Sequence, residues 1–118
     1  MKRALCLLLP WLAIAQVQAQ EVLRDKAEVE TLLAGATMQG VYLRNGSAYT
    51  LKFGEDGVFA DEKNAGARWW VTEKGQYCRE WLNGPLAGNE ACMDVALDGE
   101  RVLLFSNGSR VAEGELQR

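Results

Sequence analysis

The chain has 118 residues, a length that suits one domain, and its 13 Lys and Arg against 16 Asp and Glu give a net charge of −3. This acidic balance argues against nucleic acid or an anionic membrane as the main partner, because both require a basic surface. The chain has no histidine, the side chain best suited to accept a proton near neutral pH, and no catalytic motif, so we expect no enzyme and assign no catalytic residue.

The beginning of the chain has the three parts of a secretory signal. Lys2 and Arg3 provide a positive start, residues 4–14 form an uncharged apolar run, and small residues at signal-peptidase spacing end at Ala19 or, in the alternative, at Ala15. The apolar run is about half the ~20 residues that a membrane-spanning helix needs. We therefore predict cleavage, no membrane insertion afterwards, and a location in the periplasm or outside the cell.

Cleavage at the later site divides the chain into a signal peptide, residues 1–19, and a single β-rich domain, residues 20–118. That domain has 99 residues (118 − 19) and, with 11 basic against 16 acidic residues, a net charge of −5. Cys6 leaves with the signal peptide, so Cys78 and Cys92 are expected to form one disulfide in an oxidising compartment. Two thiolates without histidine cannot complete a tetrahedral zinc site, so we expect neither a metal nor another cofactor.

Residues 24–33 are predicted to form the only substantial helix. They contain no Gly or Pro, and apolar residues recur at i, i+3 and i+4 from Val29. Asp25 is the expected N-cap, and Gly35 is expected to stop the helix.

After Thr37 the hydrophobic period changes to two, and turn sequences recur every eight to twelve residues. The turns are Asn45-Gly46, Glu55-Asp56-Gly57, Asn64-Ala65-Gly66, Lys74-Gly75, Asn83-Gly84-Pro85, Asp98-Gly99 and Asn107-Gly108. Between them lie β-branched and aromatic runs at 41–43, 49–53, 69–72, 77–81, 92–97 and 102–105, and a frayed last strand at 113–116. This pattern predicts a mainly β fold, in which the helix packs on an antiparallel meander of about seven or eight strands, as an open sheet or a small barrel.

The central hairpin holds all three tryptophans that remain after cleavage. A three-residue loop at 73–75 would place Trp69 on the face of Tyr77 and Trp81, with Trp70 on the opposite face. A two-residue loop would exchange Trp69 and Trp70, and both registers stay open at this point.

The disulfide is expected to link neighbouring strands across residues 82–90, with Tyr77 opposite Met93. Cys78 and Cys92 would then lie on the face opposite Tyr77 and Trp81. A bridge that closes a loop of this size stabilises a fold by about 3 kcal/mol.

The candidate binding residues of this hairpin are Arg68, Trp69, Trp70, Tyr77, Arg79 and Trp81. In either register Arg79 lies between Tyr77 and Trp81 on their face. There its guanidinium could stack on a ring and bind a carboxylate or a sugar at a barrel mouth. The alternative is that the strand has reached the rim and that Arg79 extends into water, while the tryptophans fill the core.

This hairpin resembles an uncharacterised family of small exported bacterial proteins with a Gly-x-Trp motif, a Cys-x-x-Trp motif and a second Cys. The matching residues are 66–69, with one extra residue, then Cys78-Arg79-Glu80-Trp81 and Cys92, and upstream 33–40 and Asp56-Gly57. The resemblance implies a disulfide-closed β domain in the periplasm and no established activity.

A second resemblance is to periplasmic lysozyme inhibitors, which are small barrels with a disulfide. Gly46-Ser47-Ala48-Tyr49-Thr50 is similar to their Ser-Gly-x-x-Tyr inhibitory loop, with the first two residues exchanged. The resemblance implies that Ser47 and Tyr49 would contact the enzyme.

Three functional hypotheses follow. The first is an exported, non-enzymatic binding or interaction module of the bacterial envelope, whose partner is a protein or another envelope component. The second is an inhibitor or immunity-type protein that inserts the turn at 44–49 into a periplasmic hydrolase such as lysozyme. The third is a carrier of a small apolar ligand in a cavity lined by Trp69, Tyr77 and Trp81.

Overall fold

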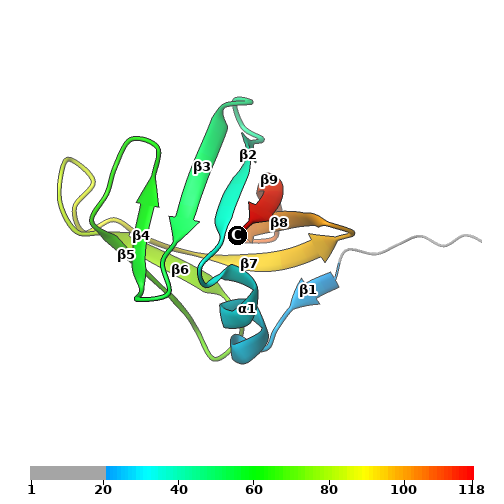
Figure 1. The fold of residues 1–118 in the computed structure, drawn as a ribbon. Coiled ribbons are helices and arrows are strands. Elements are labelled where there is room, and N and C mark those ends of the chain that lie inside the picture. Colours follow the sequence, from blue (N-terminus) through cyan, green and yellow to red (C-terminus); the bar gives the residue numbers. More distant parts are fainter. Residues whose placement is uncertain (1–20) are drawn as a thin grey trace, which may run out of the picture.

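The computed structural model describes residues 21–118, which form an eight-stranded antiparallel barrel with one extra strand and one short helix (Figure 1). In this part of the chain no helix is long and apolar enough to cross a bilayer. The predicted signal peptide lies outside the described residues. The elements in chain order are β1 (Glu21–Leu23), α1 (Lys26–Leu33), β2 (Thr37–Tyr42), β3 (Ala48–Phe53), β4 (Val58–Asp61), β5 (Ala67–Val71), β6 (Tyr77–Trp81), β7 (Glu90–Asp98), β8 (Arg101–Ser106) and β9 (Ser109–Gln117).

The sheet closes into a barrel. Strands β2 to β9 pair in chain order, and β9 then pairs with β2, so each of the eight has a hydrogen-bonded neighbour on both sides. The mainly β prediction is confirmed, and of the two architectures left open the barrel is the one observed. The last strand is not the frayed end at 113–116 that the sequence suggested, because its nine residues are held between β8 and β2.

Glycine sets the turns that separate the strands. In all seven predicted turns a glycine adopts a positive φ, between 63° and 87°. At position 75 no other residue fits, because a Cβ there would lie 2.7 Å from the backbone carbonyl carbon of Arg24. Turn chemistry therefore predicts most strand boundaries, although the run expected at 41–43 covers only the end of β2, and β1 and β4 were missed as strands.

The helix covers one end of the barrel. Asp25 caps it by accepting a hydrogen bond from the backbone N–H of Glu28 at 2.9 Å, and Val29 and Leu33 are fully buried. The helix is two residues shorter than predicted and is not the first element, because β1 precedes it and pairs with β7 at residues 95–97. Three residues are too few to show a strand period, which is why the sequence did not reveal β1.

The central hairpin has the register of the three-residue loop. Thr72 pairs with Gln76 through a 2.9 Å hydrogen bond, which leaves residues 73–75 as the loop. Trp70 lies opposite Cys78, so Trp69 and Trp81 point into the barrel and Trp70 points out.

The disulfide joins neighbouring strands on the outward-facing side of the barrel wall, where Cys78 is fully buried and Cys92 is exposed. Cys78 and Cys92 are directly paired between β6 and β7, with 4.0 Å between their Cα atoms, and Tyr77 is opposite Met93 as predicted. On the same outer face Gln76 Nε2 donates to Asp94 Oδ1 at 3.2 Å. The bridge is therefore a cross-strand link on the outward side of the wall, separate from the cluster that fills the barrel.

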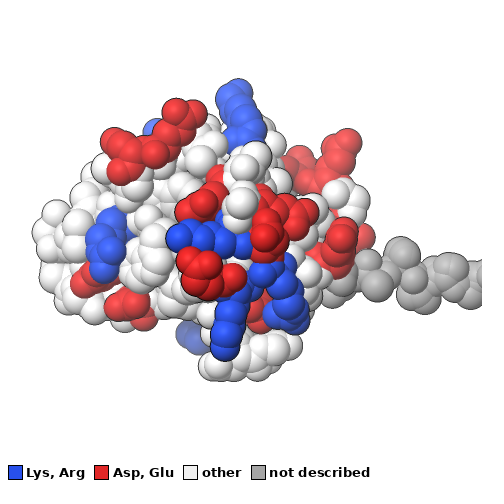
Figure 2. All heavy atoms as spheres, turned by 90° about the horizontal axis from the view of Figure 1, so that it is seen from below, with Lys and Arg blue, Asp and Glu red and all other residues white. Residues whose placement is uncertain are grey.

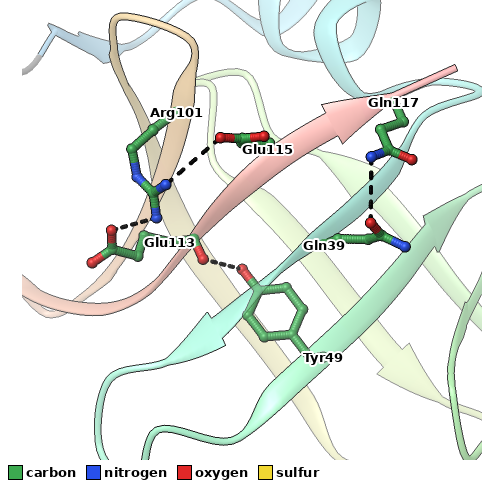
Figure 3. Close-up of polar contacts among 6 residues, drawn as sticks. All are labelled: Gln39, Tyr49, Arg101, Glu113, Glu115 and Gln117. Atoms are coloured by element: carbon green, nitrogen blue, oxygen red, sulfur yellow. Dashed lines mark hydrogen bonds and ion pairs between the residues drawn. The ribbon is translucent and has the colours of Figure 1, made fainter.

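The seam between β2 and β9 is unusually tight because two glycines face each other there. A Cβ on Gly40 would lie 1.9 Å from the carbonyl oxygen of Glu113, and one on Gly114 would lie 2.5 Å from the carbonyl oxygen of Gln39. The Tyr49 hydroxyl donates to the Glu113 carbonyl oxygen at 3.2 Å, so its ring reaches across the Gly40 position (Figure 3). Tyrosine thus fills the space that glycine leaves.

Side chains on the outside of the barrel link β9 to both of its neighbours, β8 and β2. Arg101 of β8 pairs with Glu113 and, at 3.8 Å, with Glu115 of β9, while Gln117 Nε2 donates to Gln39 Oε1 at 3.3 Å (Figure 3). These contacts are at least partly exposed and add little individually. The backbone approach of β2 and β9 is the stronger determinant of closure.

Candidate ligand-binding cavity at the barrel mouth

The end of the barrel opposite α1 contains a cavity of about 660 Å³. Its rim is formed by the β2–β3 and β6–β7 connections, the first part of β9 and the end of β4. The size is typical of sites for small organic ligands. The apolar part of its wall comes from inward residues of six strands, namely Leu51, Phe59, Tyr77, Met93, Leu104 and Ala112.

Three inward side chains of β6 run from the interior to the rim. Tyr77, Arg79 and Trp81 alternate with the outward Cys78 and Glu80, and all three line the cavity. Residues two apart on a strand are about 6.8 Å apart, so the row presents a phenol, a guanidinium and an indole at increasing height. Arg79 is half-buried and lines the same cavity as Tyr77 and Trp81, so it lies on their face, at the mouth.

Arg79 has little of its hydrogen-bonding capacity satisfied by the protein. Its Nη1 donates to Asn89 Oδ1 at 3.0 Å, and its guanidinium carbon lies 5.4 Å from the centre of the Trp81 ring. No carboxylate within residues 21–118 forms an ion pair with it. A guanidinium has five N–H donors, so most of those of Arg79 have no partner among the described residues.

The Tyr77 hydroxyl is buried without a hydrogen-bond partner. The residue is 1% exposed, and across the described residues its hydroxyl makes no hydrogen bond. Burial raises the pKa of this phenol above its usual range, while the nearby Arg79 opposes the shift. The hydroxyl therefore stays protonated at the inner end of the cavity, ready to donate.

Further polar groups line the mouth. Arg44 and Arg110 are exposed, and among the described side chains neither is ion-paired. Asp61 is the only acid in the wall, and its Oδ1 already accepts from the backbone N–H groups of Lys63 and Asn64 at 2.8 and 2.6 Å. The arginines thus outnumber the acid, and the acid is engaged in its own turn.

Tyr42 completes the rim beside the β2–β3 connection. Its ring packs on Tyr49 with 4.6 Å between centroids, and the side of the ring near Asp61 and Arg79 borders the cavity. Burial, and then the negative charge of Asp61, raise the pKa of its hydroxyl. Tyr42 therefore also remains a hydrogen-bond donor.

The opposite end of the molecule has a different surface. Figure 2, seen from below, shows the end that α1 covers, where Lys and Arg alternate with Asp and Glu. Surface charges of mixed sign are the ordinary solution for a soluble face and provide no site for one ionic ligand. The cavity at the mouth is thus the better candidate.

The structure divides the predicted hairpin residues between the two sides of the barrel wall. Tyr77, Arg79 and Trp81 line the cavity. Trp69 points inward but away from the mouth, because its indole N–H donates to the carbonyl oxygen of Gly54 at 2.8 Å in the β3–β4 turn. The predicted cavity lining of Trp69, Tyr77 and Trp81 is thus right for two of its members.

Arg68 and Trp70 lie on the outer surface. The Arg68 guanidinium lies 4.2 Å from the centre of the Trp70 ring and pairs with Glu80 at 2.8 Å. This arginine is therefore engaged by the protein itself, unlike Arg79.

The two residues of the inhibitor resemblance also separate. Ser47 is exposed in the β2–β3 connection, whereas Tyr49 is 2% exposed and bonded to the Glu113 carbonyl oxygen. Tyr49 is therefore part of the wall and is not presented to an enzyme. Lysozyme inhibition stays a prediction that would have to rely on the exposed part of this turn.

Sequence reasoning missed several residues of the mouth, notably Tyr42, Asp61 and Arg110. Arg110 pairs with Phe105 next to an irregularity at Val111 that breaks the alternation along β9, so a period-two pattern in the sequence would not have placed it at the mouth. Nowhere in residues 21–118 do three or more His, Cys, Asp or Glu side chains gather as a metal site would require.

No family model, curated protein or solved structure matches this chain. The resemblances to the exported bacterial family and to lysozyme inhibitors stay predictions.

Proposed function

We propose that this protein is an exported, non-enzymatic binding module that takes up a small molecule through the open end of its barrel. The proposal combines two of the hypotheses from the sequence, the binding module and the small-ligand carrier. It is supported by a closed lower end, an apolar-walled cavity of about 660 Å³, and several polar groups that converge on it. The disulfide fits an oxidising compartment such as the periplasm.

The observation that carries the proposal is the unsatisfied hydroxyl of Tyr77. A buried polar group without a partner costs about 1–3 kcal/mol, and phenylalanine would fill the same space without that cost. Its retention at the inner end of a cavity is explained if a bound molecule supplies the missing partner. A purely structural tyrosine would instead resemble Tyr49, whose hydroxyl is bonded within the protein.

The two tyrosines provide a matched test of this observation. We expect Tyr77→Phe to leave the free energy of unfolding unchanged or to raise it, because no hydrogen bond is lost. Tyr49→Phe should lower it by about 1 kcal/mol, because one bond is lost. Urea denaturation of both variants measures the difference. A loss of about 1 kcal/mol or more in Tyr77→Phe would show that the free protein satisfies this hydroxyl, and the supporting observation would disappear.

The function itself can be tested with a neutral fluorescent probe. N-phenyl-1-naphthylamine should bind one site per chain with an increase in its emission and a change in the emission of Trp81, which lines the cavity. We expect Ala112→Leu, which fills the cavity, to weaken binding about tenfold or more. Ala60→Leu is the control, because Ala60 is opposite Lys52 on the outer face of β4. Equal binding by both variants would exclude the mouth as the site.

A further inference from the structure

We infer that the ligand of this cavity is an organic anion, an apolar ring system with one carboxylate or sulfonate-like group, and that Arg79 is the residue that binds the charged group. The inference rests on the proposed function and specifies its ligand class. Three independent features of the mouth support it.

The first feature is the position of Arg79 within its strand. It lies between Tyr77 and Trp81, which are 1% and 6% exposed, and opposite Trp69 of β5, which is 8% exposed. An arginine at the centre of such an aromatic set is partly desolvated, and desolvation strengthens its attraction for an anion. Because no described carboxylate neutralises it, the charge is left for a molecule from solution.

The second feature is the local sign of charge. The whole chain is acidic, yet the cavity wall has Arg44, Arg79 and Arg110 against the single Asp61. The carboxylate of Asp61 is held by backbone N–H groups of its own turn, and the neighbouring Glu62 accepts from the Thr50 N–H at 2.8 Å. The nearby carboxylates thus accept hydrogen bonds from the protein backbone, whereas most N–H donors of the arginines have no partner among the described residues.

The third feature is the apolar surface next to the guanidinium. Leu51, Phe59, Met93 and Leu104 border the cavity, and Trp81 provides a ring near Arg79. An inorganic anion would leave this apolar wall in contact with water. A ligand with a ring body and one anionic group would cover the wall and meet the guanidinium at the same time, and the Tyr77 hydroxyl would reach a polar atom at its inner end.

Two probes that differ only in one group can test the inference. 8-Anilino-1-naphthalenesulfonate is N-phenyl-1-naphthylamine with an added sulfonate, so the pair separates the charge from the ring body. We expect the sulfonate probe to bind about tenfold more tightly than the neutral one and to displace it, because a charge-assisted hydrogen bond in a partly desolvated site contributes at least that factor. Added salt should weaken binding of the sulfonate probe only.

Variants then identify the arginine. We expect Arg79→Gln to abolish the preference for the sulfonate probe while leaving the neutral probe bound. Arg68→Gln is the matched control, because Arg68 lies on the adjacent strand near a tryptophan but on the outer surface. Arg79→Lys retains a positive charge and should keep part of the preference for the sulfonate probe. This variant replaces Arg79→Gln in the test if Arg79→Gln does not fold.

The outcomes separate the inference from the proposed function. Binding of the neutral probe with no preference for the sulfonate, or a preference that survives Arg79→Gln, overturns the inference and leaves the proposed function standing. If neither probe binds the wild-type protein saturably, the proposed function itself is overturned.

Discussion

Replacing Gly40 by alanine is expected to lower the free energy of unfolding by about 3 kcal/mol or more. The added methyl would lie 1.9 Å from the Glu113 carbonyl oxygen, and the atom in its way is backbone, which cannot rotate aside. Relief requires β2 and β9 to separate, which breaks the hydrogen-bonded pairing that closes the barrel. For a domain of this size the melting temperature should fall by about 12 °C or more.

Gly46→Ala is the control for this experiment. Gly46 lies in the turn that follows the same strand, and a Cβ there would meet nothing within 4 Å. Its φ of 71° is unfavourable for alanine, so we expect a cost of only about 1 kcal/mol. The melting temperatures of the two variants should therefore differ widely. Equal destabilisation would show that the β2–β9 seam accommodates a methyl group at position 40 without separating.

Reduction of the disulfide is expected to lower the free energy of unfolding by about 3 kcal/mol, because the unfolded chain regains the freedom of the closed loop. The bridge joins residues separated by 14 positions on β6 and β7. The corresponding fall in melting temperature is about 12 °C or more. Melts with and without a thiol reductant measure it, and an unchanged melting temperature would contradict the expected role of the bridge.

The double variant Cys78→Ala, Cys92→Ala is the control for reduction. It should melt near the reduced wild-type protein and should not respond to the reductant. The bridge also lies beside the mouth, because Arg79 follows Cys78 and is hydrogen-bonded to Asn89, the residue just before β7. We therefore expect reduction to weaken the sulfonate probe more than the neutral one. Equal weakening of both would show that the bridge acts on the whole barrel and not on Arg79.

The sequence was most informative where local chemistry decides the structure. Glycine at a required positive φ placed the turns, Asp25 capped the helix as predicted, and the three-residue loop that ends at Gly75 is one of the two hairpin registers that the sequence allowed. The pairing of Cys78 with Cys92 followed from the count of two cysteines in the predicted mature domain. Each of these features depends on residues close in sequence or on one adjacent strand pair.

Predictions were weaker where the structure depends on residues far apart. β1 lies beside β7 because β6 begins at Tyr77, opposite Met93, and leaves this edge of residues 95–97 free, and nothing within residues 21–23 indicates this. The last strand seemed frayed because Gly114 interrupts its apolar pattern, whereas the structure shows that this glycine permits the close approach of Gly40. A glycine can weaken a strand or allow contact between two strands, and only the partner decides which.

The row of Tyr77, Arg79 and Trp81 was determined by sequence alone, because alternation along a strand places residues 77, 79 and 81 on one face in any register. Whether that face would meet packed side chains, solvent or a cavity depended on how the sheet curves and where it closes. Closure at the Gly40–Gly114 seam and coverage of the far end by α1 leave the near end open. Arg79 is a candidate binding residue only because of the tertiary structure, since its burial and its lack of a charge partner among the described residues depend on the whole barrel.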